Sequence, residues 1–282
     1  MAAVNNNSKL YLRILLIFTA AVMAVVTAVL FVLPALHEND CKTRVNTELE
    51  SKLTSDVLNA NICIIQNKSK IIGNMEHLTY SAGASGVIFD KKAGKYYALT
   101  AYHVVSEADE NTKFLVQPYT AQLYSQYDNG GIVEYYGQFP AARVEYYEES
   151  RDLAVISFYS SESLGLVSVA ESDAEKGTDI AVISNPEGER FIHSFGNIIS
   201  NDTVDFSGND GLVNNYVIQH NAYIAPGSSG SAVLSFEDGK AEIVGINIGG
   251  GTNFMGKFSY GAMIPCQQIR SFLNNWRVAE KQ

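Results

Sequence analysis

A serine inside a glycine-rich turn is the first feature of this sequence that could do chemistry. The segment IAPGSSGSAVLS, residues 224–235, places Ser228 and Ser229 between Gly227 and Gly230, ahead of an apolar run. Glycine adopts backbone conformations that other residues avoid. Such a turn can present the Ser229 hydroxyl as a nucleophile, with the Gly227 and Ser229 amides aimed at a developing oxyanion. A plain Ser/Gly turn between two strands is the alternative, and the rest of the chain must decide between them.

A serine nucleophile requires a base to take its proton and a carboxylate to orient that base. Among the five histidines, His103 stands at the end of a strand-like run, YYALTAYHVV, where its side chain can face a cleft. Asp152 directly precedes the apolar run of RDLAVISF, so its carboxylate can lie at the rim of the same barrel or sheet. The other histidines are weaker candidates by position, beside the apolar N-terminus, in a polar loop or within strand-like runs: His37, His77, His193 and His220.

The elements that must position these residues are short strands. From Ile62 onward the chain alternates Val-, Ile-, Tyr- and Phe-rich runs with turn residues, which predicts an all-β barrel or a pair of sandwiches. EDGK at 237–240 is typical of a hairpin turn. Apolar residues at helical spacing predict a C-terminal helix over 267–280, and the Tyr- and Gly-rich segment 119–139 is expected to be a long exposed loop or hairpin.

The N-terminus is predicted to anchor the chain in a membrane. Residues 14–33 are apolar apart from two threonines, long enough as a helix to cross about 30 Å of hydrocarbon. Lys9 and Arg13 precede this run and acidic residues follow it, so residues 1–13 are expected in the cytoplasm and the rest outside. A cleaved signal peptide is the alternative, but its apolar region would be shorter. Residues 37–60 then read as a stalk helix that packs onto the domain.

The motifs together resemble those of HtrA (Deg) type trypsin-like serine proteases. GVIFDKKAGKYYALTAYHVV is similar to the strand pair before their catalytic histidine, RDLAVISF to their aspartate motif, and QHNAYIAPGSSGSAVLSFEDGKAEIVGINIG to their nucleophile segment. GTDIAVISNPEGERFIHSFGNIIS and SYGAMIP match two further strand segments, and the likeness covers about residues 55–278. The order histidine, aspartate, serine is also that of chymotrypsin-type barrels.

The resemblance implies a fold, a mechanism and a set of site residues. The fold would be two six-stranded antiparallel β-barrels of the chymotrypsin type with a C-terminal helix, preceded by a transmembrane helix over 14–36, and residues 61–282 would be the protease domain. His103 would be the general base, Asp152 its orienting carboxylate and Ser229 the nucleophile that forms an acyl-enzyme. The oxyanion hole would be made by residues of the turn: Gly227, Ser228 and Ser229.

The sequence departs from the family at two places. Ser228 precedes the nucleophile where the family usually has Asn, and Ser231 replaces the second of two glycines after it. The chain ends soon after the C-terminal helix, so no PDZ domain is expected. Ser231 motivates an alternative function, a protease-like binding or sensing module with little or no turnover.

The specificity pocket is expected to accept small or apolar side chains. Tyr223 lies six residues before the nucleophile, where trypsin-like barrels have the base of the pocket, and no acidic residue occurs between Tyr216 and Ile224. A preference for Arg or Lys by the trypsin route is therefore not expected. The predicted pocket residues are Tyr223, Ile246, Asn247, Ile248 and Gly249.

The composition limits the classes of partner that the chain is expected to bind. The chain has 20 Lys and Arg against 30 Asp and Glu, which argues against nucleic acid, so the expected partners are protein or peptide substrates and the membrane. Cys41, Cys63 and Cys266 are too few and too scattered for a metal site, and neither a metal nor a cofactor is expected. One disulfide is compatible with an extracytoplasmic domain, but the sequence does not decide its pairing. Trimers are common in the family, and the sequence leaves a homo-oligomer open.

Overall fold

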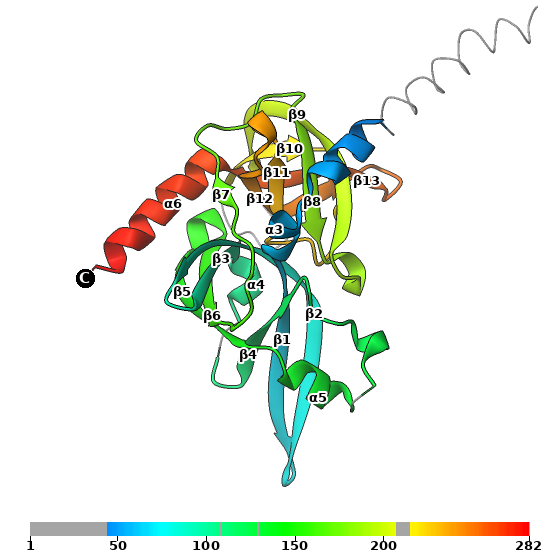
Figure 1. The fold of residues 1–282 in the computed structure, drawn as a ribbon, viewed down its shortest axis with the longest axis vertical. Helices are drawn as coiled ribbons and strands as arrows, with labels where there is room; N and C mark the ends of the chain where they lie inside the picture. Colours follow the sequence, from blue (N-terminus) through cyan, green and yellow to red (C-terminus); the bar gives the residue numbers. More distant parts are fainter. Residues whose placement is uncertain (1–43, 108, 129, 207–214, 282) are drawn as a thin grey trace, which may run out of the picture. The chain divides into compact units, whose positions relative to one another are not determined.

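The fold consists of strands and short helices that end in one long helix (Figure 1). The computed structural model describes residues 44–281 apart from 108, 129 and 207–214. The strands are β1 Asn61–Ile72, β2 Met75–Lys92, β3 Lys95–Ala101, β4 Thr112–Pro118, β5 Ala141–Glu148, β6 Leu153–Tyr159, β7 Ser168–Val169, β8 Asp179–Ser184, β9 Ile192–Phe206, β10 Asn215–His220, β11 Ala232–Ser235, β12 Glu242–Thr252 and β13 Phe258–Pro265. The α-helices are α3 Ser55–Asn59, α4 Tyr102–Val105, α5 Ile132–Gly137 and α6 Cys266–Ala279. The short 3-10 turns are η2 Tyr124–Gln126, η3 Glu149–Arg151, η4 Pro186–Gly188 and η5 Glu237–Gly239.

The N-terminal barrel closes in the order β1-β2-β3-β6-β5-β4, and all its pairings are antiparallel. Its strands alternate side chains between the two faces, so apolar residues such as Ile62, Ile88 and Ile156 fill the interior. Closure leaves this sheet without an edge, which removes the unpaired backbone groups that would otherwise face solvent.

The C-terminal barrel is a second ring of six antiparallel strands. Its order is β11-β8-β9-β10-β13-β12, the ring is closed by pairing of β11 with β12, and the two-residue β7 adds to β12 in parallel. The expected EDGK turn is η5, which joins β11 to β12. The predicted pair of six-stranded barrels is therefore confirmed, and the alternative of two sandwiches is excluded.

One apolar core joins the barrels and the C-terminal helix. It contains Leu99 and Val155 of the first barrel, Ile183 and Leu234 of the second, and Phe272 of α6. The helix buries one stripe, as its spacing predicted: Cys266, Ile269, Phe272, Leu273 and Trp276. The Trp276 ring packs against Phe89 and Tyr97, with centroids 5.7 and 5.3 Å apart.

The predicted stalk helix is interrupted in the structure. Residues 44–52 are helical, the chain breaks at Leu53, and Thr54 then caps α3 by accepting a hydrogen bond from the Val57 amide at 3.5 Å. Leu49, Leu53 and Val57 are buried, and the compact unit begins at Leu49 rather than at residue 61.

The predicted cytoplasmic tail and membrane anchor, residues 1–36, lie outside the described residues, as does Cys41. In the part of the chain that the structure describes, no helix is both long and apolar enough to cross a bilayer. Cys63 and Cys266 are both buried free thiols.

Two segments differ from their sequence-based expectation. The hairpin of β1 and the first half of β2 extends away from its barrel (Figure 1) and was not predicted, because its outer residues are exposed and carry no alternating apolar pattern. Segment 119–139 was expected to be an exposed loop or hairpin, but it contains η2 and α5 and buries Tyr135, Tyr136 and Phe139. Six helical residues are too few to show a helical period in the sequence.

Candidate active site

His103 and Asp152 are brought together by the pairing of β3 with β6. The register sets Ala101 opposite Leu153, so the end of one strand lies beside the start of the other. His103 follows in the first turn of α4, and Asp152 ends η3 in the left-handed region, with φ 50°. The Asp152 carbonyl oxygen accepts a hydrogen bond from the Tyr102 amide at 3.0 Å, which fixes the two segments to each other.

The Asp152 carboxylate binds His103 through both of its oxygens. Oδ1 accepts the His103 backbone N–H at 2.8 Å, and Oδ2 lies 2.7 Å from His103 Nδ1. Because an ionised carboxylate only accepts hydrogen bonds, the proton of the neutral ring lies on Nδ1. The Nε2 atom is then free of a proton and can act as a base. The His103 side chain is 38% exposed, so substrate can reach it.

The turn that carries Ser229 depends on two glycines. Gly227 has φ 103° and Gly230 has φ 84°, conformations that L-residues with a side chain rarely adopt. A Cβ at Gly230 would overlap the Ser85 carbonyl oxygen and the Thr100 hydroxyl. The serine turn, residues 227–230, therefore packs directly against the end of β3, two residues before the helix that carries His103.

Ser85 of β2 ties the same turn to the N-terminal barrel. The Ser85 amide donates to the Ser229 carbonyl oxygen at 2.9 Å, and the Ser85 hydroxyl donates to the Gly227 carbonyl oxygen at 2.8 Å. The structure thus holds all three predicted site residues where the barrels meet. In the described residues the Ser229 hydroxyl makes no hydrogen bond to the His103 ring, and such bonds are often long before substrate binds.

Two backbone amides of the turn are free to bind an oxyanion. Among the described residues, neither the Gly227 nor the Ser229 amide donates to a protein acceptor. The Pro226 carbonyl oxygen accepts a hydrogen bond from the Glu187 amide at 2.7 Å. Since the peptide bond is trans, the Gly227 N–H points the opposite way from that carbonyl. The Ser228 hydroxyl is buried and bonded to the Ala225 amide at 3.2 Å, so within the predicted oxyanion hole Ser228 shapes the turn.

Ser231, the departure from the family pattern, is fully accommodated. Its hydroxyl donates to the Ser228 carbonyl oxygen at 2.7 Å and accepts from Asn247 Nδ2 at 2.9 Å. His220 Nε2 lies 2.7 Å from Asn247 Oδ1, and since that oxygen can only accept, His220 is the donor. Burial lowers the pKa of His220 to about 4, so this histidine is neutral and structural.

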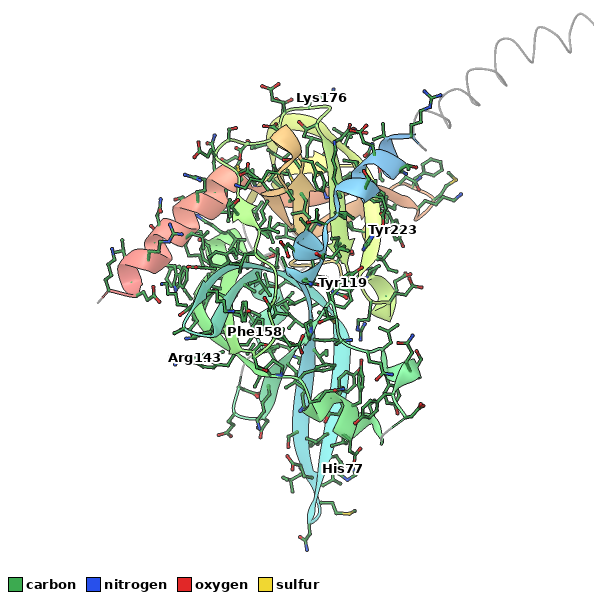
Figure 2. All side chains as sticks on the ribbon, viewed as in Figure 1. His77, Tyr119, Arg143, Phe158, Lys176 and Tyr223 are labelled. Carbon is green, nitrogen blue, oxygen red and sulfur yellow. The ribbon has the colours of Figure 1, made fainter. Side chains whose placement is uncertain are left out.

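The pocket beside Ser229 differs in part from the predicted one. It has a volume of about 420 Å³, and its lining includes Tyr223 and Gly249 of the predicted set (Tyr223 is labelled in Figure 2). The expectation for Ile246, Asn247 and Ile248 was wrong, because Ile246 and Ile248 pack in the core and Asn247 binds Ser231. The other lining residues are Glu187, Ile224, Ala225, Pro226, Ser228, Ser229, Gly250, Gly251, Thr252, Gly256 and Phe258.

Sequence reasoning missed three residues of the site. Ser85 of β2 and Asn185, which directly follows β8, support the turn, with the Asn185 amide donating to the Ser85 hydroxyl at 3.1 Å. Glu187 lines the pocket. None of the three shows a local pattern, since each acts through residues distant in the chain. In the described part of the chain, no group of three His, Cys, Asp or Glu side chains is arranged to hold a metal ion.

Comparisons with known proteins agree with this geometry. The family model described as a trypsin-like peptidase domain matches residues 84–246. The chain is 29% identical over 167 residues to a "Serine protease Do-like HtrB" of Bacillus subtilis (58% of this chain, 32% of that protein) and 32% identical over 173 residues to a "Serine protease Do-like HtrA" of the same species (60% and 34%). It is 29% identical over 196 residues to a "Probable serine protease do-like" of Buchnera aphidicola (68% and 35%). The matches thus span about a third of the length of these curated relatives.

Proposed function

Because the chain belongs to the family of trypsin-like peptidase domains, whose HtrA-type members are serine endopeptidases, we propose that it hydrolyses peptide bonds with His103, Asp152 and Ser229 as its triad. The observation that supports this most directly is the 2.7 Å contact between His103 Nδ1 and the Asp152 carboxylate, near a serine turn that contains two glycines with positive φ. A carboxylate that fixes the histidine tautomer is what a serine nucleophile requires.

The proposed reaction has two halves. Ser229 Oγ attacks the substrate carbonyl carbon while His103 Nε2 takes the hydroxyl proton, and the resulting oxyanion is bound by the Gly227 and Ser229 amides. The C–N bond breaks as His103 returns that proton to the leaving amine, which leaves an acyl-enzyme on Ser229. Water, deprotonated by His103, then hydrolyses the ester and regenerates Ser229. Asp152 stays ionised and stabilises the imidazolium in both halves.

The test is labelling of the full-length chain in detergent with a fluorophosphonate probe, which reacts only with an activated serine. We expect the wild-type protein to be labelled and the Ser229→Ala and His103→Ala variants to lose labelling. Each variant should also lower the kcat of peptide cleavage by several orders of magnitude, because triad members act as a unit. Thr54→Ser, which keeps a hydroxyl at the N-cap of α3 before the barrels, serves as a control that should label normally. Absence of labelling in a folded wild-type protein would favour the alternative, a binding or sensing module.

We also propose that the protease domain lies outside the cytoplasm on a single N-terminal anchor. The support is the apolar run 14–33 with basic residues before it and acidic residues after it. Fractionation tests this: the full chain should remain in membranes after alkaline carbonate extraction, and its C-terminus should be open to added protease in intact cells. Release by carbonate would contradict the proposal.

A further inference from the structure

The pocket beside Ser229 contains a carboxylate that could recognise a positively charged substrate. Glu187 is the one charged residue among the described residues that line this pocket. We propose that Glu187 determines specificity by favouring a lysine or arginine side chain next to the scissile bond. The proposal rests on the proposed function, since it names a substrate class for the same site.

The backbone holds Glu187 in a defined place. Its amide donates to the Pro226 carbonyl oxygen at 2.7 Å, one residue before the oxyanion amide of Gly227. Glu187 also adopts φ 53°, in the left-handed region that residues with a side chain seldom occupy. The preceding Asn185 is buried and donates from Nδ2 to the Ser85 hydroxyl at 3.0 Å. These contacts hold the Glu187 backbone beside the turn that carries Ser229, and Glu187 lines the pocket at that turn.

The Glu187 carboxylate has no cationic partner in the described part of the chain. Arg190, the nearest cation along the chain, donates instead to Gln117 Oε1 at 3.2 Å and to the carbonyl oxygens of Gly188 and Glu189. A substrate cation would therefore meet an unpaired negative charge rather than displace an existing ion pair. The formal charge of −10 on the whole chain adds a weaker attraction of the same sign.

The pocket walls suit a long side chain with a charged end. Tyr223 and Phe258 meet edge to face, with ring centroids 5.5 Å apart, and Ile224 adds an aliphatic surface. Lysine and arginine pack their methylene stems on apolar surface while the head group reaches a polar partner. Aromatic rings also attract cations. A volume of about 420 Å³ admits such a side chain. The sequence-based expectation of small or apolar side chains considered the residues just before Ser229 and the apolar, glycine-rich segment 245–251, and it did not include Glu187.

The experiment compares kcat/KM of the full-length protein in detergent for peptide pairs that differ only by lysine against methionine. One pair carries the change on the acyl side of the scissile bond, and a second carries it on the leaving-group side, which shows where the cation sits. For at least one pair we expect the wild-type protein to prefer lysine by about 1.5-fold to fivefold, the range for an exposed ion pair. Glu187→Gln should remove that preference and Glu187→Lys should reverse it. Glu189→Gln removes an exposed carboxylate outside the pocket and should leave the preference unchanged.

A binding measurement separates this proposal from the proposed function. Ser229→Ala protein should bind the lysine peptide more tightly than the methionine peptide, by a margin that falls with added salt and disappears in the Ser229→Ala, Glu187→Gln double variant. If the wild-type protein cleaves nothing but this margin is seen, the proposed function fails and the role of Glu187 stands. Equal affinities, or a lysine preference that survives Glu187→Gln, would overturn the role of Glu187 whatever the turnover.

Discussion

At the scale of single residues, the candidate site depends on backbone conformations that few side chains allow. Gly227 and Gly230 have positive φ, and so do Asp152 and Glu187. In Asp152 and Glu187 this conformation is strained, because they carry a side chain that glycine lacks. Asp152 binds His103, Gly227 and Gly230 flank Ser229, and Glu187 lines the pocket beside it. Strain that gathers around one serine is typical of a functional site, because the surrounding structure must hold each conformation.

Gly230→Ala tests how strictly the turn is constrained. The new methyl group would overlap the Ser85 carbonyl oxygen and the Thr100 hydroxyl, in addition to the strain of φ 84°. We expect the free energy of unfolding to fall by about 2–4 kcal/mol from left-handed strain and overpacking together. A shift of Ser229 by about 1 Å would lower kcat/KM by about a hundredfold. Urea denaturation and peptide cleavage measure the two effects.

Gly177→Ala is the matched control for that prediction. Gly177 also has positive φ, 92°, but a Cβ there would meet no atom within 4 Å. We expect a loss of about 1–2 kcal/mol from the backbone alone, with activity unchanged. If Gly230→Ala and Gly177→Ala lost activity equally, close packing of the serine turn against β3 would not be the cause of the loss in Gly230→Ala.

At the scale of elements, the register of β3 against β6 brings His103 and Asp152 together. The ladder from Lys95 opposite Tyr159 to Ala101 opposite Leu153 runs without a shift, so both residues follow it at the same barrel rim. The C-terminal helix stabilises the arrangement from outside, since α6 contributes to the core shared by both barrels. The helix was predictable because its apolar residues recur at helical spacing.

Trp276→Ala should weaken this helix contact without touching the site. The indole is 3% exposed and packs between Phe89 and Tyr97, so its removal should lower the free energy of unfolding by about 3–5 kcal/mol. Val278→Ala, on the exposed face of the same helix, should change it by less than about 0.5 kcal/mol. Thermal and urea denaturation measure both, and similar losses in the two variants would show that α6 does not pack as described.

At the scale of the whole protease domain, the candidate site is formed by residues of both barrels. Ser85 of the first barrel contacts Gly227 and Ser229 of the second, and Asn185 donates to the Ser85 hydroxyl from both its amide and its side chain. Neither barrel could form the site alone. The position of one barrel against the other therefore controls the distance between the His103 ring and the Ser229 hydroxyl.

Ser85→Ala should loosen this junction. The change leaves the buried Asn185 amide without its acceptor, at a cost of about 1–3 kcal/mol in the free energy of unfolding. The change also removes the hydrogen bond to the Gly227 carbonyl oxygen. We expect kcat/KM to fall by a larger factor than KM rises, so that kcat falls as well, because the Gly227 amide is proposed to bind the oxyanion of the transition state. Ser81→Ala, on the exposed part of the same strand, should change neither quantity. Cleavage kinetics at saturating and limiting peptide would contradict the role of Ser85 if the two variants behaved alike.

The sequence by itself determined the all-β class, the C-terminal helix and the order of His103, Asp152 and Ser229, because periodicity and motif spacing are local properties of the chain. It also indicated that Gly227 and Gly230 allow the unusual backbone of the serine turn, because positive φ at a glycine is a local property as well. Only the tertiary structure decided the pocket and its support: that Ile246 and Ile248 turn into the core, and that Ser85 reaches the turn from β2 and Glu187 from η4. Contacts between residues far apart in the chain leave no pattern in either segment, so they become visible only when the two barrels are packed together.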